Sequence, residues 1–419
     1  MKKIFFVTKL KTTNLGNEGL SNELINAFFS NVDDAIINVN GRPLGLTKYD
    51  PSVLLKSKDP LLKFEQWTDQ IANEINQQKS LPFAQKKSKV ELTVINKSRK
   101  KWFFIKGVLK SILSISNNLF TYNKRYADRA RILKSADWVI YNGAGEVNDG
   151  HHGNFGKAGV FFRQMIELRV SQKLGLKTAA INQSILLRNP LSQKIISQVY
   201  GKMEKIVVRG ESSRKGLISM GVNEKIIEIA PDFTVNFNFN QIASTTTKLK
   251  NKIGFNITKD VDFDLETISR IFTHLKSKGK EIVFCTNEPS GDAAIIKLLV
   301  KEFGIPVIRS DYGYKYYIEE LSKFEFVISM RVHTNMFTLV SKTPIIPLEA
   351  EDFRLAEILD ILEYPIVPIK TKKSDWVDLL LNEIDNLTDN KYDYNKYFSE
   401  KFDKIKSTSL NNISWINQF

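Results

Sequence analysis

The stretch FVISMRVHTN, residues 326–335, decides the fold of the second half of this chain. Its opening FVIS predicts a short buried strand, and the spacing at residues 335–341 predicts a helix after it. The turn between them places Arg331 and His333, two residues apart, at the end of the strand. A guanidinium and an imidazole at a strand end are typical of a site that binds an anion or moves a proton, although a lone histidine can also be structural.

The same alternation of strand and helix extends outward from this stretch. It covers residues 3–230, stops in an Asn-, Ser- and Thr-rich segment at 236–251, and restarts at residue 252. Strands separated by helices of this length are typical of parallel βαβ units. We therefore expect an α/β fold with two Rossmann-like lobes facing each other across a cleft, where ligands bind at the carboxyl ends of strands. The expected parts are a first lobe at 1–240, a second lobe at 251–375, and a tail at 376–419 that could cross back to the first lobe.

Composition and charge exclude several classes of protein. The chain has 419 residues, a net charge of +15 and a hydrophobic content of 42%, which is ordinary for a globular protein. Its one cysteine, Cys285, cannot form an internal disulfide, and with four histidines it cannot build a cysteine-rich zinc site, so we expect no metal. The apolar run at residues 4–7 is too short for a signal peptide, and no run approaches the ~18 residues of a spanning helix. We therefore expect a cytoplasmic protein.

The basic residues concentrate between residues 86 and 134, in a region near 84–135 that we interpret as an insertion. Aromatic and aliphatic residues are interleaved with them, which fits a solvated helix pair with a buried apolar stripe. The pattern also fits peripheral contact with the inner face of an anionic membrane through the stretch from Lys97 to Lys110. Nucleic acid is not an expected partner, because no helix-turn-helix, RNP or zinc-finger pattern accompanies the charge.

Two further motifs join a strand to a helix. They are NLGNEG at residues 14–19 and VVRGESS at residues 207–213. The N–H groups at a helix start attract anions, and a strand-terminal arginine beside them adds a fork that fits phosphate or carboxylate. The first motif could equally be a plain turn, and the arginine of the second could pair with Glu211 or Asp232. The candidate anion-binding residues here are Asn14, Gly16, Arg209 and Ser213.

Another candidate is NGAGE, residues 142–146, at the end of a strand predicted at 136–141. It has neither the Gly-x-Gly-x-x-Gly register nor a following Gly-Lys-Ser/Thr, which excludes a dinucleotide site and a P-loop. The segment can hold a ligand oxygen, and a plain strand-to-loop turn is equally consistent with it.

In their order and spacing, these motifs resemble those of the polysaccharide pyruvyl transferase family. The resemblance rests on residues 14–18, 143–145, 182–185, 208–209 with Ser213 and Leu217, 221–222, 230–232 and 329–333. It implies two Rossmann-like lobes in the manner of GT-B glycosyltransferases, the first holding the acceptor and the second the donor. It also implies transfer of pyruvate from phosphoenolpyruvate to two hydroxyls of a sugar, as a cyclic ketal, in bacterial surface-polysaccharide biosynthesis.

The resemblance assigns roles to residues that match the family's motifs. Its basic residues carry over to Arg209, Arg331 and His333. Guanidinium forks match the phosphate and carboxylate of phosphoenolpyruvate, and His333 would protonate the vinyl carbon or stabilise the departing phosphate. We expect no cofactor besides this co-substrate, and an acceptor saccharide that is free or lipid-linked. The expected donor-site residues are Asn14, Gly16, Arg209, Ser213, Arg331 and His333, and the expected acceptor-site residues are Glu146, Asp149, His151 and Gln183.

Two other functions remain open at this point. The same architecture could serve a glycosyltransferase that uses a nucleotide-sugar donor, with Glu349 or Glu351 binding the ribose. A non-catalytic binder of an anionic polymer or lipid headgroup would be favoured if Arg331 and His333 do not face the cleft.

Overall fold

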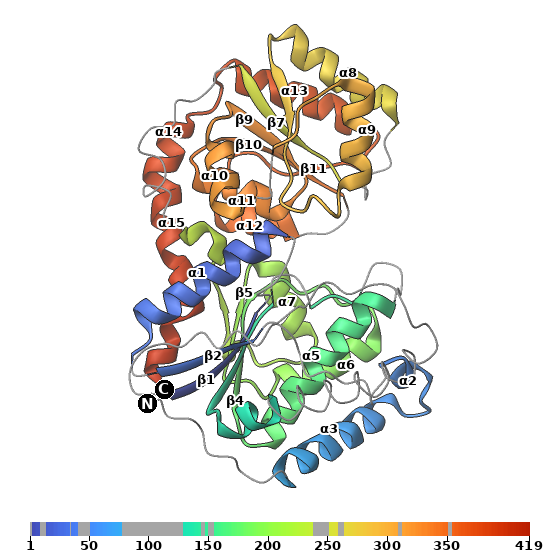
Figure 1. Cartoon of the computed structure of the whole chain (residues 1–419), viewed down its shortest axis with the longest axis vertical. Helices are drawn as coiled ribbons and strands as arrows, with labels where there is room; N and C mark the ends of the chain where they lie inside the picture. The colour runs from blue at the N-terminus through green and yellow to red at the C-terminus, as the bar shows by residue number, and fades with distance from the viewer. Residues whose placement is uncertain are drawn as a thin grey trace, which may run out of the picture. The chain divides into compact units, whose positions relative to one another are not determined.

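The computed structural model contains two parallel α/β sheets, one of six strands and one of five (Figure 1). It describes residues 2–8, 14–33, 35–40, 51–77, 129–143, 147–149, 155–237, 251–258, 264–308, 312–350 and 354–419. The chain divides into two compact units. Unit 1 comprises Met1–Lys9, Val32–Val208 and Ser213–Glu228, and unit 2 comprises Leu10–Asn31, Arg209–Ser212 and Ile229–Phe419.

The sheet of unit 1 has the strand order β2-β1-β3-β4-β5-β6, and its pairings from β2 to β5 are parallel. Every residue of β3 is buried, as expected for a parallel sheet covered on both faces. The strands are β1 (Lys2–Val7), β2 (Ala35–Asn40), β3 (Trp138–Asn142), β4 (Lys177–Gln183), β5 (Lys205–Val208) and β6 (Ile227–Ile229). The α-helices among the described residues of this unit are α2 (Pro51–Lys56), α3 (Pro60–Gln77), α5 (Phe155–Lys173), α6 (Pro190–Tyr200) and most of α7 (Glu211–Ser219).

Helix α3 packs against α5 in unit 1 (Figure 1). Glu65 on α3 pairs with Arg169 on α5, with 2.9 Å between Oε1 and Nε, and the Nζ of Lys173 contacts the same carboxylate at 2.7 Å. Deeper in the unit, the Nε of Arg129 donates to Glu167 Oε1 at 2.7 Å, and both side chains are buried. Paired charges of this kind can be buried because each satisfies the other.

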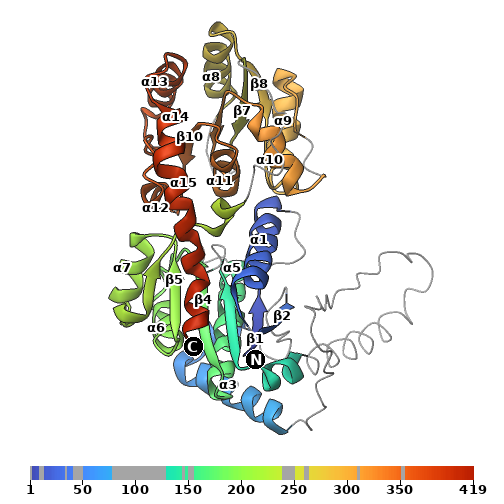
Figure 2. The same ribbon diagram turned by 90° about the vertical axis from the view of Figure 1, so that its left-hand side faces the viewer.

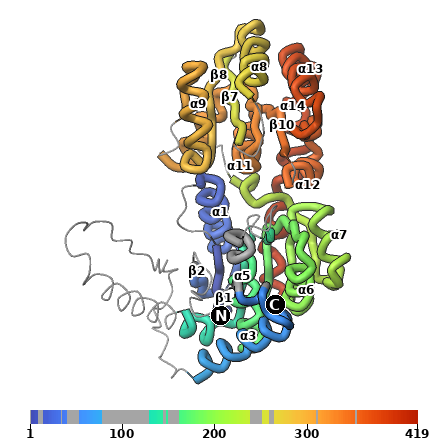
Figure 3. The backbone as a smooth tube through the Cα atoms, turned by 90° about the vertical axis from the view of Figure 1, so that its right-hand side faces the viewer, coloured from blue at the N-terminus to red at the C-terminus, as the bar shows by residue number. Residues whose placement is uncertain are grey.

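The sheet of unit 2 has the order β11-β10-β9-β7-β8, with all four pairings parallel. Its strands are β7 (Lys252–Asn256), β8 (Glu281–Phe284), β9 (Phe326–Ser329), β10 (Ile345–Glu349) and β11 (Ile369–Lys370). The helices of unit 2 are α1 (Leu15–Asn31), α8 (Leu265–Ser277), α9 (Ala293–Phe303), α10 (Tyr314–Ser322), α11 (Val332–Val340), α12 (Arg354–Ile361), α13 (Trp376–Thr388), α14 (Tyr394–Lys396) and α15 (Asp403–Ser407). Helices α8 and α13 lie side by side, joined by the pair of His274 Nε2 and Asp385 Oδ1 at 2.9 Å (Figure 2 and Figure 3).

The compact units interleave along the sequence, whereas the expected lobes were continuous segments. Helix α1 follows β1 directly in the chain, yet it groups with unit 2 and packs on α10 and α11. The C-terminal tail also contacts residues of unit 2 that are distant from it in sequence. Lys406 Nζ donates to the carbonyl of Phe237 at 2.7 Å, and Asn417 Nδ2 donates to that of Asn31 at 2.7 Å. The arrangement of two lobes about a cleft stays a prediction.

Candidate functional site

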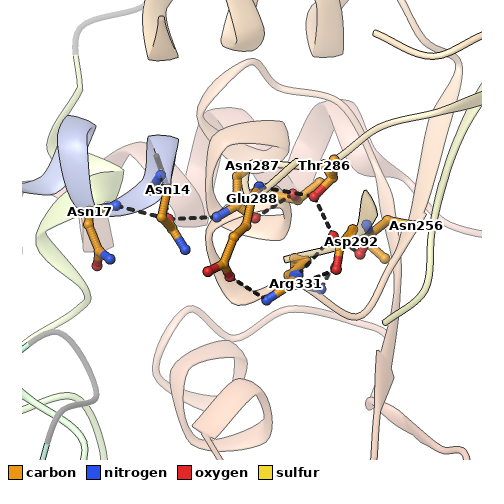
Figure 4. Close-up of polar contacts among 11 residues, drawn as sticks. Asn14, Asn17, Asn256, Thr286, Asn287, Glu288, Asp292 and Arg331 are labelled. Atoms are coloured by element: carbon orange, nitrogen blue, oxygen red, sulfur yellow. Dashed lines mark hydrogen bonds and ion pairs between the residues drawn. The ribbon is translucent and has the colours of Figure 1, made fainter. Parts of the chain in front are cut away.

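Polar side chains gather where three neighbouring strands of unit 2 end (Figure 4). Asn256 ends β7 and Ser329 ends β9, and the two residues are partners in the strand ladder. The segment after β8 supplies Thr286 to Glu288. Parallel strands bring their carboxyl ends to one edge of the sheet, which is where α/β proteins bind ligands. This edge is the candidate site.

Arg331 sits at this edge, immediately before α11, and two carboxylates hold it. Its Nη1 contacts Glu288 Oε2 at 2.7 Å. Its Nε contacts Asp292 Oδ2 at 3.2 Å, and its Nη2 pairs with the other oxygen of Asp292. Asp292 also accepts a hydrogen bond from Thr286 Oγ1 at 2.5 Å. The orientation of the guanidinium is therefore fixed by Glu288 and Asp292, two residues that the sequence did not single out.

Arg209, the second predicted cation, belongs to the same compact unit as Arg331. It is buried, and its Nε lies 2.8 Å from Asp232 Oδ2, which bears out one of the two pairings that the sequence left open. Burial lowers the pKa of Arg209, although the charge of Asp232 acts in the opposite direction. Burial alone would raise the pKa of Asp232, but the charges of Arg209 and His333 and hydrogen bonds from Thr234 lower it below its usual range.

His333 lies in the first turn of α11, and its ring packs against the start of α1. A Cβ added to Gly16 would lie 2.2 Å from His333 Cγ and 2.4 Å from His333 Cβ. Only a glycine allows the two helices to approach this closely. His333 is buried but for 9% of its surface, and its charge influences Asp232. Unit 2 thus contains Arg209, Asp232, His333 and Gly16, linked by successive interactions.

The side chain of Asn14 caps the start of α1. Its Oδ1 accepts hydrogen bonds from Gly16 N at 3.0 Å and Asn17 N at 3.2 Å. The same oxygen accepts from Asn287 Nδ2 at 2.9 Å, and Leu15 N donates to the carbonyl of Asn287 at 2.7 Å. The helix-start N–H groups are therefore engaged within the protein, and donor-binding roles for Asn14 and Gly16 stay predictions.

Ser213 groups with unit 1, apart from Arg209 in the division of the chain. Its buried Oγ accepts a hydrogen bond from Ile185 N at 3.0 Å. Gln183, predicted for the acceptor, is also buried in unit 1, where its Nε2 donates to the carbonyls of Tyr141 at 3.2 Å and Ile181 at 3.0 Å. Both side chains hold strand ends and turns together in this structure, so their roles at a ligand stay predictions.

Asp149 is buried and accepts backbone hydrogen bonds from Arg188 and Asn189, at 3.0 Å and 2.7 Å to its Oδ2. These contacts give it a role in fixing the loop before α6. Glu146 and His151 lie outside the described residues, as do Glu351 and the stretch from Lys97 to Lys110. The acceptor site and the predicted membrane contact therefore stay predictions.

Glu349, the candidate ribose ligand of a glycosyltransferase, is engaged at the start of α12. Its Oε1 accepts from Leu355 N at 3.0 Å and Ala356 N at 3.3 Å, and its other carboxylate oxygen pairs with Lys370. With 4% of its surface exposed, it serves as a structural cap.

Within the described ranges, no group of three or more His, Cys, Asp or Glu side chains is placed to hold a metal ion. In that same part of the chain, no helix is both long and apolar enough to cross a membrane.

Similarity to solved structures supports the expected fold class. UDP-GlcNAc 2-epimerase from Neisseria meningitidis, bound to UDP-GlcNAc, is 9% identical, with a TM-score of 0.50 over 100% of this chain and 98% of that one. UDP-GlcNAc 2-epimerase from Methanocaldococcus jannaschii is 13% identical, with a TM-score of 0.50 over 100% of both chains. At identities this low, structural similarity shows the fold alone. It confirms the prediction of a GT-B-like protein with two parallel α/β sheets.

Sequence similarity gives the family. No curated protein is significantly similar in sequence to this chain. The polysaccharide pyruvyl transferase family, by contrast, matches residues 92–352, which is well over half of the chain and includes Arg209, Arg331 and His333. The enzyme predicted from its motifs is confirmed at this level: the chain belongs to the polysaccharide pyruvyl transferase family.

Proposed function

We propose that this enzyme transfers the pyruvyl group of phosphoenolpyruvate to two hydroxyls of a saccharide, as a cyclic ketal, during assembly of a bacterial surface polysaccharide. The observation that carries the proposal is that Arg209, Arg331 and His333 belong to one compact unit, in which Arg331 and His333 follow the carboxyl end of β9. Phosphoenolpyruvate carries a phosphate and a carboxylate, and two fixed guanidinium groups match that pair of anions.

In the proposed reaction His333 gives a proton to C3 of phosphoenolpyruvate, and C2 becomes an oxocarbenium-like centre. One sugar hydroxyl attacks C2, the C2–O bond to phosphate breaks, and the second hydroxyl closes the ketal. Of the two protons lost from the hydroxyls, one balances the proton added at C3 and the other leaves with inorganic phosphate. The buried carboxylate of Asp232 supports this role, because it lies close enough to His333 for the two charges to interact.

The engagement of Glu349 by the backbone of α12 and by Lys370 weakens the case for a nucleotide-sugar donor. That alternative remains an outcome of the test. Because a ligand that binds only the native state raises the melting temperature, phosphoenolpyruvate should stabilise the protein more than UDP-, GDP- or CMP-linked sugars. A larger shift with a nucleotide sugar would favour glycosyl transfer.

The direct experiment is incubation with phosphoenolpyruvate and a panel of sugar acceptors, with mass detection of the pyruvyl ketal. His333→Ala should keep the fold and lower turnover by about 100-fold or more, the range expected for loss of a general acid. His274→Ala is the matched control, because His274 pairs with Asp385 between α8 and α13. Equal turnover of the His333 variant and the wild type would remove His333 from the proton transfer.

A further inference from the structure

Arg331 is held by two carboxylates in very different surroundings. The side chain of Asp292 is 0% exposed, contacts two nitrogens of the guanidinium, and accepts a hydrogen bond from Thr286. The side chain of Glu288 is 33% exposed and contacts the guanidinium at Nη1, with 2.7 Å between Nη1 and Oε2. The two acids therefore hold the same cation with unequal strength.

We propose that Glu288 is an exchangeable counter-ion of Arg331, which an oxygen of the anionic donor must displace in order to bind. This inference rests on the proposed function, since it concerns the same arginine. In the structure the Glu288 carboxylate takes the position at Nη1 that a phosphate or carboxylate oxygen of the ligand would need. Asp292 stays in place and keeps the guanidinium oriented during the exchange.

The energetics favour exchange at Glu288 over exchange at Asp292. Pairs exposed to solvent are weak, because water and salt screen them and the long side chains lose entropy. A buried pair is costly to break, because the charge left behind is desolvated. Arg331 is 21% exposed, so its Nη1 edge can be opened while the edge held by the buried Asp292 remains closed.

Gly291 allows this arrangement. A Cβ at this position would lie 3.1 Å from Glu288 Cδ and 3.4 Å from Arg331 Nη2, which is tighter than ordinary contact in the first case. The absence of a side chain leaves Glu288 room to approach the guanidinium.

Charge makes Glu288 a determinant of specificity. Two carboxylates and one guanidinium sum to a formal charge of −1, which repels an incoming anion until Glu288 moves away. A ligand must then interact more strongly with Arg331 than the carboxylate that it replaces. Groups with more than one negative charge, such as a phosphate, meet this condition better than a neutral or singly charged group.

The test compares Glu288→Gln with the wild type by calorimetric titration of phosphoenolpyruvate and, separately, of inorganic phosphate. Removing the competing charge should lower the Kd for both by about 2- to 5-fold, the range that corresponds to an exposed ion pair. Glu320→Gln is the matched control, because Glu320, on α10, pairs with Lys323 at the end of that helix and its loss changes the net charge equally. It should leave both Kd values unchanged.

A purely structural role for Glu288 predicts the opposite, because loss of a supporting contact would weaken anion binding or leave it as it was. Unchanged or raised Kd values in Glu288→Gln would therefore overturn the proposal. So would a lowered Kd that persists when Arg331→Gln is added, since the effect must act through that guanidinium. Tighter phosphate binding without any binding of phosphoenolpyruvate would support the role of Glu288 and contradict the proposed function. Absence of binding of both anions would overturn both.

Discussion

Substitution of Gly16 by alanine tests whether the start of α1 positions the imidazole of His333. The added Cβ would lie 2.2 Å from His333 Cγ, 2.3 Å from Nδ1 and 2.4 Å from Cβ. A rotation about χ1 can move the ring, but it cannot move His333 Cβ, which is fixed to the backbone of α11. To go from 2.4 Å to the 3.4 Å of ordinary contact, the two helix starts must separate locally by about 1 Å.

This displacement should change both stability and turnover. Overpacking of a closely packed contact typically costs about 1–3 kcal/mol, and a misplacement of about 1 Å at a reacting group can lower the rate by roughly 100-fold. Gly216→Ala, in helix α7, is the matched control, because its Cβ would meet only Met220 Cε at 3.9 Å. Both substitutions gain the helix propensity of alanine, so their difference in unfolding free energy isolates the steric term.

The assays are urea unfolding of both variants and phosphoenolpyruvate-dependent ketal formation with the best acceptor of the panel. We expect Gly16→Ala to be about 1–3 kcal/mol less stable than Gly216→Ala. If the two variants match in stability and in rate, α1 does not position His333. If Gly16→Ala loses stability but keeps its rate, the location of the imidazole is unimportant and His333 is not the proton carrier.

Two further predictions concern buried ion pairs, and urea unfolding measures both. Because the pKa of Asp232 is lowered in the folded protein, its carboxylate stabilises the fold above about pH 4, where the unfolded group titrates, and this contribution is lost as the pH falls further. Asp232→Asn removes the charge that pairs with the buried Arg209, so it should lower the free energy of unfolding by about 3–5 kcal/mol at neutral pH. As the pH falls below about 4, the variant should then lose less stability than the wild type. Equal losses of stability in acid for the two proteins would contradict this. Arg129→Ala removes the cation that pairs with the buried carboxylate of Glu167, and it should also lower the free energy of unfolding by about 3–5 kcal/mol. Arg131 is exposed, so Arg131→Ala should change the free energy of unfolding by less than about 0.5 kcal/mol.

The alternation of apolar and helical segments was sufficient to predict the fold class, because each parallel strand is a short local signal. The strand predicted at residues 326–329 coincides with β9, and the alternation predicted to restart at residue 252 does so there, with β7. The helix predicted at 335–341 begins earlier, at Val332, so His333 lies within α11 and Arg331 precedes it directly. Strand-to-helix turns are hard to delimit from sequence, since β-branched residues such as Val332 favour strands in isolation.

The partners of the site residues were harder to predict because they are distant in sequence. His333 packs against Gly16, and Arg331 pairs with Glu288 and Asp292, which follow a different strand. The grouping of α1 with unit 2 is also invisible in the sequence, where α1 simply follows β1. One local signal was available: the polar segment TNEPSGD, residues 286–292, directly follows the apolar run IVFC at 282–285, which has the length and composition of a buried strand, and so belongs at the same sheet edge as Arg331.

Pairing with acids also changes what the two arginines imply for ligand binding. A guanidinium that is removed from water must be paired, and each arginine has its own buried carboxylate: Asp232 for Arg209 and Asp292 for Arg331. Two arginines counted from sequence suggest a charge of +2, but these partners reduce the sum over the four groups to zero. In the proposed function, the two arginines therefore offer the donor oriented N–H groups with little net charge, and Glu288 makes the balance negative until it moves. The proposal therefore makes selection of a multiply charged donor depend on bidentate geometry and on displacement of Glu288, more than on long-range attraction by the basic chain.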